Sequence, residues 1–391
     1  MPTSYAWVLL ATGSLTGSPP AAMTRSIHHT SYQPWYGIGV EIRNEARSGE
    51  LLIVTVIKGS PAHKAGIRVG DVIGEMVRDV DSWGVRLPRT ETISTKNLGV
   101  KKAVDLILGK EATRLRLMIR REGVNAPFGV DLTRGRVEFE SILGYKRKDG
   151  ANWDYMIDPK SKIGYVRLSN FSHNTYRDLV AAVDELKKQG VKGLVFDLRS
   201  NPGGLLDSAI EVTDLFTDDG LIATIRPRGG PRRWAIFCGT SAGSRLDFPM
   251  ACLVNGETAS VSEIVAAALQ DHKRGRLFGE RTVGKGSVQN IEDIEVIDPK
   301  TNQKLRGEIK YTNATFGRPN GKNLDRDTAD ERDEWGVTPD EVIAITPRER
   351  RALAEQRDRD RSVTRKDTGR GEDRQLDAAL KYLRARIAAA K

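Results

Sequence analysis

The feature that most constrains the fold is a regular alternation of apolar strands and helices that begins at residue 163. Residues 164–168 have the composition of a strand, and a helix is expected over 175–189, ended by Gly190. Residues 193–198 form a continuous apolar run of the kind found in strands buried on both faces. The rhythm continues through a helix over 205–215, a strand over 251–254 and a helix over 260–269. Such alternation predicts a parallel sheet with crossover helices, which is an α/β domain.

The chain before this domain has a different pattern, with short strands and few helices. Strands are expected over 38–42, 51–57, 72–77 and 113–119, with a short helix within 59–66 and a longer one over 100–108. The length of 391 residues predicts two to three domains. We expect an N-terminal segment (1–34), an α+β domain (35–121), connector strands (122–162), the α/β domain (163–346), and a charged linker with an amphipathic C-terminal helix (347–391).

Composition excludes several classes of function. The net charge is +10, but residues 347–391, with 14 basic and 8 acidic side chains, carry +6 of it. The charge therefore indicates a solvated tail, and we expect no nucleic-acid partner. Two cysteines and five histidines leave little for a metal site, so we expect no metal and no cofactor. No apolar run approaches the roughly 18 residues of a membrane-spanning helix, so no integral membrane segment is expected.

The first residues resemble part of a secretory signal. An apolar stretch over 5–12 is followed by small residues and Pro19-Pro20-Ala21-Ala22, but no Lys or Arg precedes Arg25. A signal of this kind predicts an extracytoplasmic location. A disordered N-terminus explains the same residues.

Three motifs resemble known active centres without the context that each requires. Gly239-Thr240-Ser241-Ala242-Gly243 reads as a nucleophile elbow, but the short, proline-bound segment after it does not predict a helix. Residues 279–286 come close to a phosphate-binding loop, but Gly286 replaces the Ser or Thr, and a strand follows over 287–296. Asp271-His272 with Ser260 would need a hydrogen bond across about 18 Å of helix.

A fourth arrangement, Ser260 with Lys285, has the context that catalysis needs. Ser260 follows a buried strand and begins a helix, so it is expected at the carboxyl edge of the sheet, where the N–H of Val261 could stabilise an oxyanion. Lys285 lies between two glycines and could act as a base if an apolar wall desolvated it, with Gln289 to orient it. The alternative is a serine that only caps its helix and a lysine that is simply exposed.

Three ordered motifs resemble those of the C-terminal processing (tail-specific) serine proteases. The nucleophile motif is similar to Thr258-Ala259-Ser260-Val261-Ser262-Glu263-Ile264, and the general-base motif to residues 279–289. The oxyanion motif is similar to Asp197-Leu198-Arg199-Ser200-Asn201-Pro202-Gly203-Gly204. Upstream, Tyr36-Gly37-Ile38-Gly39 with residues 59–71 resembles a PDZ domain. The resemblance covers about residues 35 to 345.

The resemblance implies a PDZ-like β-sandwich or barrel with helices, followed by a ClpP/crotonase-like α/β serine protease domain. It implies Ser260 as nucleophile, Lys285 as general base, Gln289 as its orienting residue, and the N–H groups of Gly204 and Val261 as oxyanion hole. An acidic residue at the position of Asp271 is implicated in some members. The peptide-binding residues it implies are Tyr36, Gly37, Ile38, Gly39, Val40, Val104 and Leu108, of which Ile38, Val40, Val104 and Leu108 would supply an apolar pocket.

The implied activity is that of a serine endopeptidase that captures C-terminal tails and cleaves by an acyl-enzyme route. Its expected partners are proteins or peptides with accessible C-termini, and a second copy of the chain is a further candidate. The alternative is a peptide-binding PDZ scaffold whose protease domain is inactive. Family members usually carry a helical region before the PDZ domain. In this sequence only about 34 residues precede the segment that resembles that domain.

Overall fold

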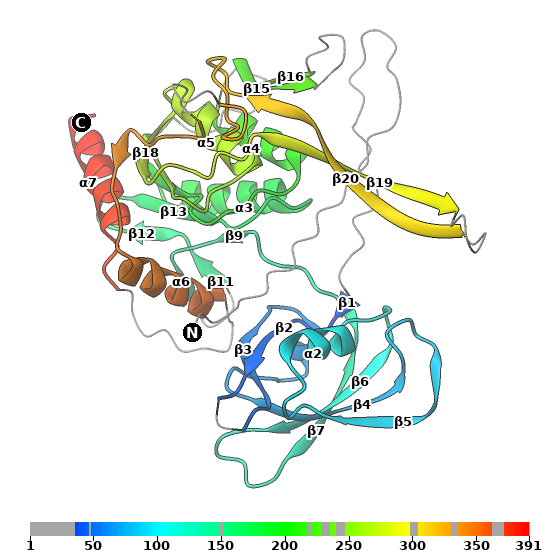
Figure 1. Ribbon diagram of the computed structural model, residues 1–391. Helices are drawn as coiled ribbons and strands as arrows, with labels where there is room; N and C mark the ends of the chain where they lie inside the picture. Colours follow the sequence, from blue (N-terminus) through cyan, green and yellow to red (C-terminus); the bar gives the residue numbers. More distant parts are fainter. Residues whose placement is uncertain are drawn as a thin grey trace.

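The computed structural model describes residues 36–46, 48–148, 152–217, 220–227, 235–239, 247–297, 304–329, 335–361 and 371–390. The signal-like segment and most of the Gly-x-Ser-x-Gly motif lie outside them. The described chain is a mixed α/β structure, as expected, with an N-terminal unit and a larger unit built on a parallel sheet (Figure 1).

The N-terminal unit is an antiparallel sheet with two helices. Its strand order is β2-β3-β4-β6-β7, and β5 pairs with β4. The strands are β2 (Val40–Asn44), β3 (Leu51–Val56), β4 (Val72–Val80), β5 (Arg86–Ser94), β6 (Arg114–Arg120) and β7 (Phe128–Thr133). The helices are α1 (Pro61–Lys64) and α2 (Val100–Ile107), and a small ladder joins β1 (Tyr36–Gly37) to β8 (Gly135–Arg136). Strand β5 was not predicted.

Alternating residues build this sheet. In β6, Leu115, Leu117 and Ile119 are buried, while the alternate residues Arg114, Arg116, Met118 and Arg120 are exposed or half-buried on the other face. This is the period-two pattern of a half-buried strand. Because β7 pairs with β6 over six residues, and Leu132 lies in the same core, the unit continues to about residue 136. The boundary expected at residue 121 is therefore too early.

The larger unit contains the parallel sheet that the alternation predicted. Its strand order is β12-β13-β14-β17-β18-β21, and β9 also pairs with β13. The strands are β9 (Ile142–Leu143), β12 (Met156–Asp158), β13 (Ile163–Leu168), β14 (Gly193–Asp197), β17 (Met250–Val254), β18 (Gly275–Gly279) and β21 (Glu341–Val342). From β13 to β21 neighbouring strands are parallel, while β9 and β12, from the expected connector, join antiparallel. Strand β18 was not predicted.

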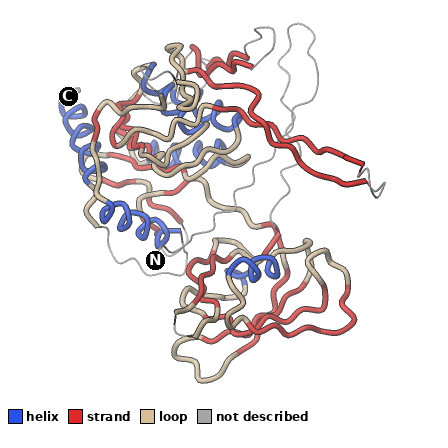
Figure 2. The backbone as a smooth tube through the Cα atoms, in the orientation of Figure 1, coloured by secondary structure: helices blue, strands red, loops and turns tan. Residues whose placement is uncertain are grey.

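Helices cover both faces of this sheet (Figures 1 and 2). On one face α3 (Thr175–Lys188), α4 (Leu206–Phe216) and α5 (Val261–Asp271) enclose the largest apolar core. On the other face lies α7 (Arg374–Ala389), the expected C-terminal helix, whose Leu376, Ala379, Leu380 and Leu383 are buried against the sheet. The linker expected before it is wrong in part, because residues 347–361 form a helix, α6 (Pro347–Arg361).

A second sheet projects from the larger unit. Its order is β16-β15-β20-β19, with β15 (Gly220–Pro227), β16 (Ala235–Gly239), β19 (Ser287–Ile297) and β20 (Lys304–Gly317), and the β19–β20 ribbon extends away from the molecule in Figure 1. A further short ladder pairs β10 (Lys146–Lys148) with β11 (Asn152–Asp154). Strand β16 precedes the Gly-x-Ser-x-Gly motif but runs antiparallel, whereas a nucleophile elbow follows a strand of the central sheet.

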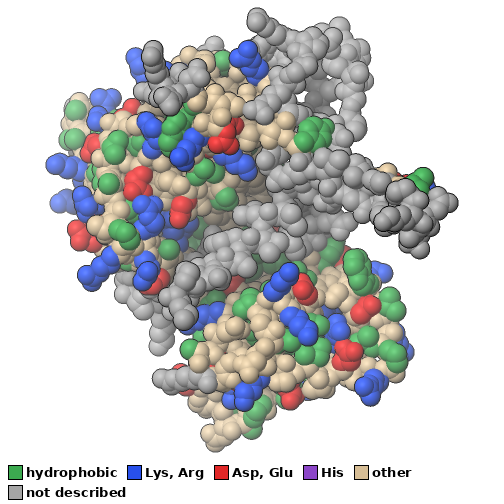
Figure 3. Space-filling model, viewed as in Figure 1, with side chains coloured by type: hydrophobic (Ala, Val, Ile, Leu, Met, Phe, Trp, Pro, Cys, Tyr) green, Lys and Arg blue, Asp and Glu red, His purple; other side chains and the backbone are tan. Residues whose placement is uncertain are grey.

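On the face drawn in Figure 3, basic and acidic side chains are interspersed, and the described residues show no single basic patch there. Within the described part of the chain, no helix is long and apolar enough to cross a membrane. No cluster of three or more His, Cys, Asp or Glu among these residues could hold a metal ion.

Candidate active site

Three loops meet at the carboxyl edge of the parallel sheet. They follow β14, β17 and β18, which are consecutive neighbours in the strand order, so their ends lie side by side. The loop after β14 carries the glycine turn, the loop after β17 ends at Ser260, and the loop after β18 carries Lys285. The sheet thus brings together three motifs separated by up to about 80 residues of sequence, at the edge where parallel sheets place their sites.

Ser260 occupies a strained position at the start of α5. It is the N-cap residue, with φ 60° and ψ −128°, and it is half-buried. A residue other than glycine at positive φ costs roughly 1–2 kcal/mol, so the surrounding contacts must hold it there. The turn from the buried strand into the helix places the Ser260 side chain at the edge of the sheet.

Glu263 is the side chain that holds this turn. Its Oε2 accepts the N–H of Ser260 and the N–H of Lys285, each at 2.8 Å. Its Oε1 accepts the N–H of Gly284 at 2.7 Å and the hydroxyl of Thr282 at 2.5 Å. A fully buried carboxylate therefore ties the serine turn to the lysine loop.

The four donors also explain how a buried charge is tolerated. Burial raises the pKa of Glu263 above its ordinary value, and the hydrogen bonds from Thr282, Gly284, Lys285 and Ser260 oppose that rise. Sequence reasoning gave Glu263 no role of its own. The signal was present, because Ser260 and Glu263 have the Ser-x-x-Glu spacing of a capping box.

The glycine turn lies against the Ser260 side chain. A Cβ added at Gly203 would come within 3.3 Å of Ser260 Oγ, and one at Gly204 within 2.1 Å of the carbonyl oxygen of Phe171, so both positions need glycine. Both glycines also have positive φ. Asn201 fixes the turn, since its side chain accepts the Gly203 N–H and its carbonyl accepts the Ala259 N–H.

Two backbone N–H groups near Ser260 have no acceptor among the described residues. They belong to Gly204, in the turn, and to Val261, in the first turn of α5. Free N–H groups at a helix start are expected, because the first residues of a helix have no intrahelical partner. These are the two groups that the family resemblance implied for an oxyanion hole.

Lys285 is exposed, so the described residues do not form the apolar wall that would desolvate it. The physical reason lies in its neighbours. A Cβ at Gly284 would meet Trp335 at 2.6 Å and one at Gly286 would meet the Asp325 backbone at 2.4 Å, so both glycines face inward while the lysine between them faces out. Among the described residues no hydrogen bond joins Lys285 to the Ser260 hydroxyl.

The backbones of Ser260 and Lys285 are nevertheless close. Because both nitrogens lie 2.8 Å from the same oxygen of Glu263, they are within about 5.6 Å of each other. A lysine has a flexible four-carbon stem, and rotation of that stem can bring its amine to a neighbour at this range. Gln289 lies in β19, but its side chain is outside the described part.

The other candidate centres do not assemble. The loop after Gly279 contains no helix and Gly286 leads into β19, unlike a phosphate-binding loop. Asp271 lies at the far end of α5, about 16 Å of helix from Ser260, in a buried ion pair with Arg318 at 2.6 Å. His272 caps the same end, with its Nε2 2.8 Å from the carbonyl oxygen of Leu221.

The predicted peptide groove lies between β2 and α2. Strand β2 is at the edge of its sheet, and its outer edge pairs with no described strand. Val40, Val104 and Leu108 are half-buried, whereas Ile38 is fully buried in the core of the unit and cannot line a pocket with its side chain. The described residues offer no acceptor for the N–H of Ile38 or of Gly39.

The remaining residues predicted for the groove support the segment of Ile38 and Gly39 that precedes β2. Tyr36 and Gly37 form β1, and Leu108 packs over Gly37, where an added Cβ would lie 3.1 Å from Leu108 Cδ2. Gly39 has φ 76° and no room for a side chain, because a Cβ would meet that of Ser60.

The part of the chain that holds this site is similar in sequence to known proteins. Residues 162–343 match the profile of peptidase family S41. These residues belong to peptidase family S41. The matched residues contain the glycine turn, Ser260, Glu263 and Lys285, which meet at the edge of the parallel sheet.

Relatives of the chain include two curated bacterial proteins. The carboxy-terminal processing protease CtpA of Bacillus subtilis is 34% identical, over 69% of this chain and 52% of its own length. The carboxyl-terminal-processing protease of Picosynechococcus is 33% identical, over 80% of this chain and 65% of its own length. The chain thus spans about half to two thirds of these relatives.

A solved structure, the photosystem II D1 C-terminal processing protease, is 30% identical and is covered over 73% of its length, with a TM-score of 0.43.

Proposed function

We propose that this protein is a serine endopeptidase in which Ser260 is the nucleophile and Lys285 the general base. One observation carries the proposal above the others. Half-buried Ser260 lies against the glycine turn, and the N–H groups of Gly204 and Val261 have no acceptor among the described residues. The N–H of Ser260 is held by the carboxylate that also holds Lys285. N–H groups fixed around a nucleophile stabilise the charge that develops on a carbonyl oxygen.

The first half of the reaction would form an acyl-enzyme. The neutral amine of Lys285 accepts the proton of the Ser260 hydroxyl as Oγ attacks the peptide carbonyl. The carbonyl oxygen becomes an oxyanion, to which Gly204 and Val261 donate their N–H groups. Lys285 then gives its proton to the leaving amine, the C–N bond breaks, and an ester to Ser260 remains.

The second half would release the product. Water attacks the ester carbonyl while Lys285 takes its proton, and the proton returns to Ser260 Oγ as the C–O bond breaks. For both steps the Lys285 side chain turns from solvent toward Ser260, a tightening that catalytic hydrogen bonds commonly undergo when substrate binds. We assign Gln289, which follows four residues later, to orient that amine.

We further propose that the N-terminal unit is a PDZ domain that captures the C-terminus of the substrate. An extended peptide would pair with the open edge of β2, opposite α2. The N–H groups of Ile38 and Gly39 would receive its carboxylate, and Val40, Val104 and Leu108 would contact its last side chain. The larger unit would then be a ClpP/crotonase-like protease domain that cleaves upstream of the captured end.

The exposure of Lys285 favours a second candidate function, a peptide-binding scaffold without protease activity. In that case Ser260 would only cap α5.

Turnover of a protein substrate distinguishes the two functions. Purified protein should degrade an unfolded test protein, and a Ser260→Ala variant of equal thermal stability should not. Absence of cleavage by the wild-type chain, with peptide binding retained, would favour the scaffold.

For the cellular context we propose an extracytoplasmic location, on the strength of the signal-like residues 5–22. Fractionation of cells that express the full chain would test it. Recovery of the protein only with cytoplasmic markers would contradict it.

A further inference from the structure

The strand that leads to the glycine turn ends in a buried ion pair. Asp197, the last residue of β14, is fully buried, and its carboxylate accepts the Nη2 of Arg199 at 2.7 Å and the hydroxyl of Tyr165 at 2.7 Å. It also accepts the backbone N–H of Arg199 at 2.9 Å. Arg199 is itself only 2% exposed. The guanidinium is therefore fixed on one side by the strand that precedes the turn.

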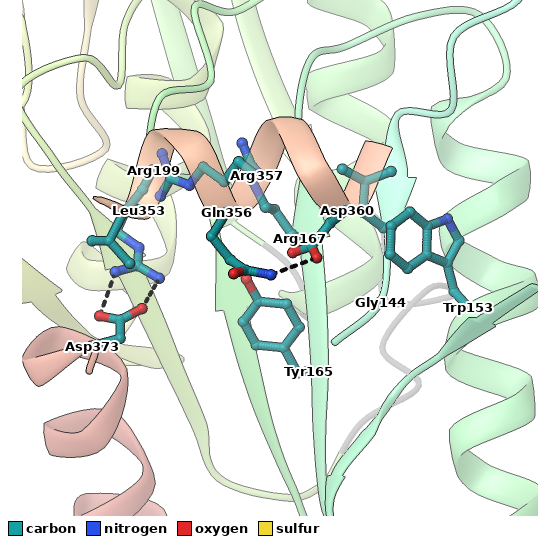
Figure 4. A pocket seen from close by; sticks show the side chains of 11 residues that line it. Gly144, Trp153, Tyr165, Arg167, Arg199, Leu353, Gln356, Arg357, Asp360 and Asp373 are labelled. Carbon is teal, nitrogen blue, oxygen red and sulfur yellow. Dashed lines mark hydrogen bonds and ion pairs between the residues drawn. The ribbon is translucent and has the colours of Figure 1, made fainter. Parts of the chain in front are cut away.

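On its other side the same guanidinium binds the C-terminal helix (Figure 4). Asp373, the N-cap of α7, accepts Nη1 and Nη2 of Arg199 at 2.9 Å each, which is a bidentate contact. Gln375 accepts Nη1 at 3.1 Å, and its own amide donates to the carbonyl of Ile343. Two parallel hydrogen bonds fix both position and orientation of an arginine.

Helix α6 reaches the same turn. Arg357 donates a hydrogen bond from Nη1 to the Ser200 hydroxyl, and Ser200 has a positive φ of 59°. The N–H of Ser200 is held by the side chain of Asn255, in the loop after β17. Both helices of the C-terminal segment thus contact the residues directly before the glycine turn.

A short path of direct contacts leads from Arg199 to the nucleophile. Two residues along the chain lies Asn201, which is fully buried and accepts the Gly203 N–H with its side chain. The carbonyl of Asn201 accepts the N–H of Ala259, the neighbour of Ser260. Displacement of Arg199 would therefore move the segment that aims the Gly204 N–H.

We propose that Arg199 is a positioning residue through which α7 holds the oxyanion turn, so that the C-terminal segment belongs to the working active site. The proposal rests on the proposed function, since it concerns the same reaction. The apolar stripe of α7 already docks the helix on the sheet. Removal of one partner of the bidentate pair should therefore loosen the turn while α7 stays in place.

The chain offers a matched pair of variants. Asp373→Ser keeps an N-capping hydroxyl for α7 and removes the carboxylate that binds Arg199. Asp377→Ser makes the same change in the first turn of the same helix, at an exposed residue without contact to Arg199. Arg199→Lys keeps the charge and loses the bidentate geometry.

Two measurements on the full-length protein test the proposal. The first is turnover of an unfolded test protein, separated into kcat and KM. We expect kcat of Asp373→Ser and Arg199→Lys to fall at least tenfold with KM within twofold of wild type, and Asp377→Ser to be unchanged. The second is amide hydrogen exchange in Ser260→Ala protein. We expect Asp373→Ser to speed exchange across 200–204 while 376–383 stay protected.

The hydrogen-exchange measurement distinguishes a failure of the Arg199 proposal from a failure of the proposed peptidase function. If the wild-type chain shows no turnover, the proposed function fails, and exchange alone still decides whether α7 holds the turn. Kinetics and exchange equal to those of Asp377→Ser would overturn the proposal. So would loss of protection over 376–383, because the pair would then only anchor the helix.

Discussion

Oε2 of Glu263 accepts the backbone N–H of Lys285 at 2.8 Å, across 22 residues of sequence. The same oxygen accepts the N–H of Ser260, so the relative position of the serine turn and the lysine loop depends on one buried carboxylate. This relationship fixes the two backbones and leaves the lysine side chain free to move.

The Glu263 contacts predict that even an amide replacement fails. In Glu263→Gln only one oxygen remains for four donors, and the new NH₂ group faces N–H groups. Each buried donor left without a partner costs about 1–3 kcal/mol, so we expect a loss of at least about 2 kcal/mol in the free energy of unfolding and a large loss of turnover. Urea unfolding measures the loss of stability. The control is Glu211→Gln, which changes an exposed carboxylate on α4. Equal stability of the two variants would contradict this role.

The glycine turn predicts a difference between two glycine substitutions. Gly204→Ala combines positive φ with a Cβ that would meet the Phe171 carbonyl, whereas Gly190→Ala also has positive φ but open space around the new Cβ. Both changes incur strain of roughly 1–2 kcal/mol, and only Gly204→Ala must also move backbone. We expect it to abolish turnover and to lower Tm further than Gly190→Ala. Similar Tm and activity for the two would argue against a tightly packed turn.

The buried ion pair predicts a pH dependence of stability. Burial disfavours the charged forms of Asp197 and Asp373, but Arg199 outweighs it and holds the pKa of each carboxyl below its usual range. Their contribution is therefore fully present above the unfolded pKa of about 3.9 and is lost as pH falls through the lowered pKa of the folded state.

The test compares wild type with Asp373→Asn, which keeps the helix cap. Asp197 still pairs with Arg199 in this variant, so the difference in unfolding free energy at pH 7 should stay below the roughly 3–5 kcal/mol of an unpaired buried charge, and it should shrink toward pH 2. A difference that stays constant from pH 7 to pH 2 would exclude the charge as its cause.

The groove predicts selection of substrate C-termini. Burial of a terminal Val beside Val40, Val104 and Leu108 is worth about 1.5–3 kcal/mol, roughly 10- to 150-fold in affinity. Peptides that differ only in a terminal Val, Asp or amide should be compared for binding to the full chain with Ser260→Ala. We expect the Val peptide to bind most tightly and both others to lose tenfold or more. Equal affinity for the three would remove support for the groove.

Much of the larger unit could be predicted from sequence because its strands and helices differ in local pattern. Buried strands such as β14 are continuous apolar runs, and Gly190 marks the end of α3. Ser260 was placed correctly at the start of α5 for the same reason. The prediction was wrong for α6, which was assigned to a linker because of its charged residues. Many of those residues have high helix propensity, and tertiary contacts stabilise the helix.

Other features depend on contacts between distant residues, which sequence does not encode locally. Exposure of Lys285 follows from Trp335 and Asp325, which occupy the space beside its flanking glycines. The role of Arg199 needs Asp373, 174 residues later. Strand β7 was assigned to a connector because only its pairing with β6 shows that it completes the N-terminal sheet.

The most direct test of the central claim is the rate at which an unfolded test protein is cleaved by four full-length proteins. These are wild type, Ser260→Ala, Lys285→Ala, and Lys322→Ala as an exposed lysine control. A general base contributes about 10²- to 10⁴-fold, and residues that act as a unit fail together. We expect Ser260→Ala and Lys285→Ala to lose at least 100-fold and Lys322→Ala to match wild type. Retention of more than a few per cent of the wild-type rate by Lys285→Ala would contradict the Ser260–Lys285 mechanism.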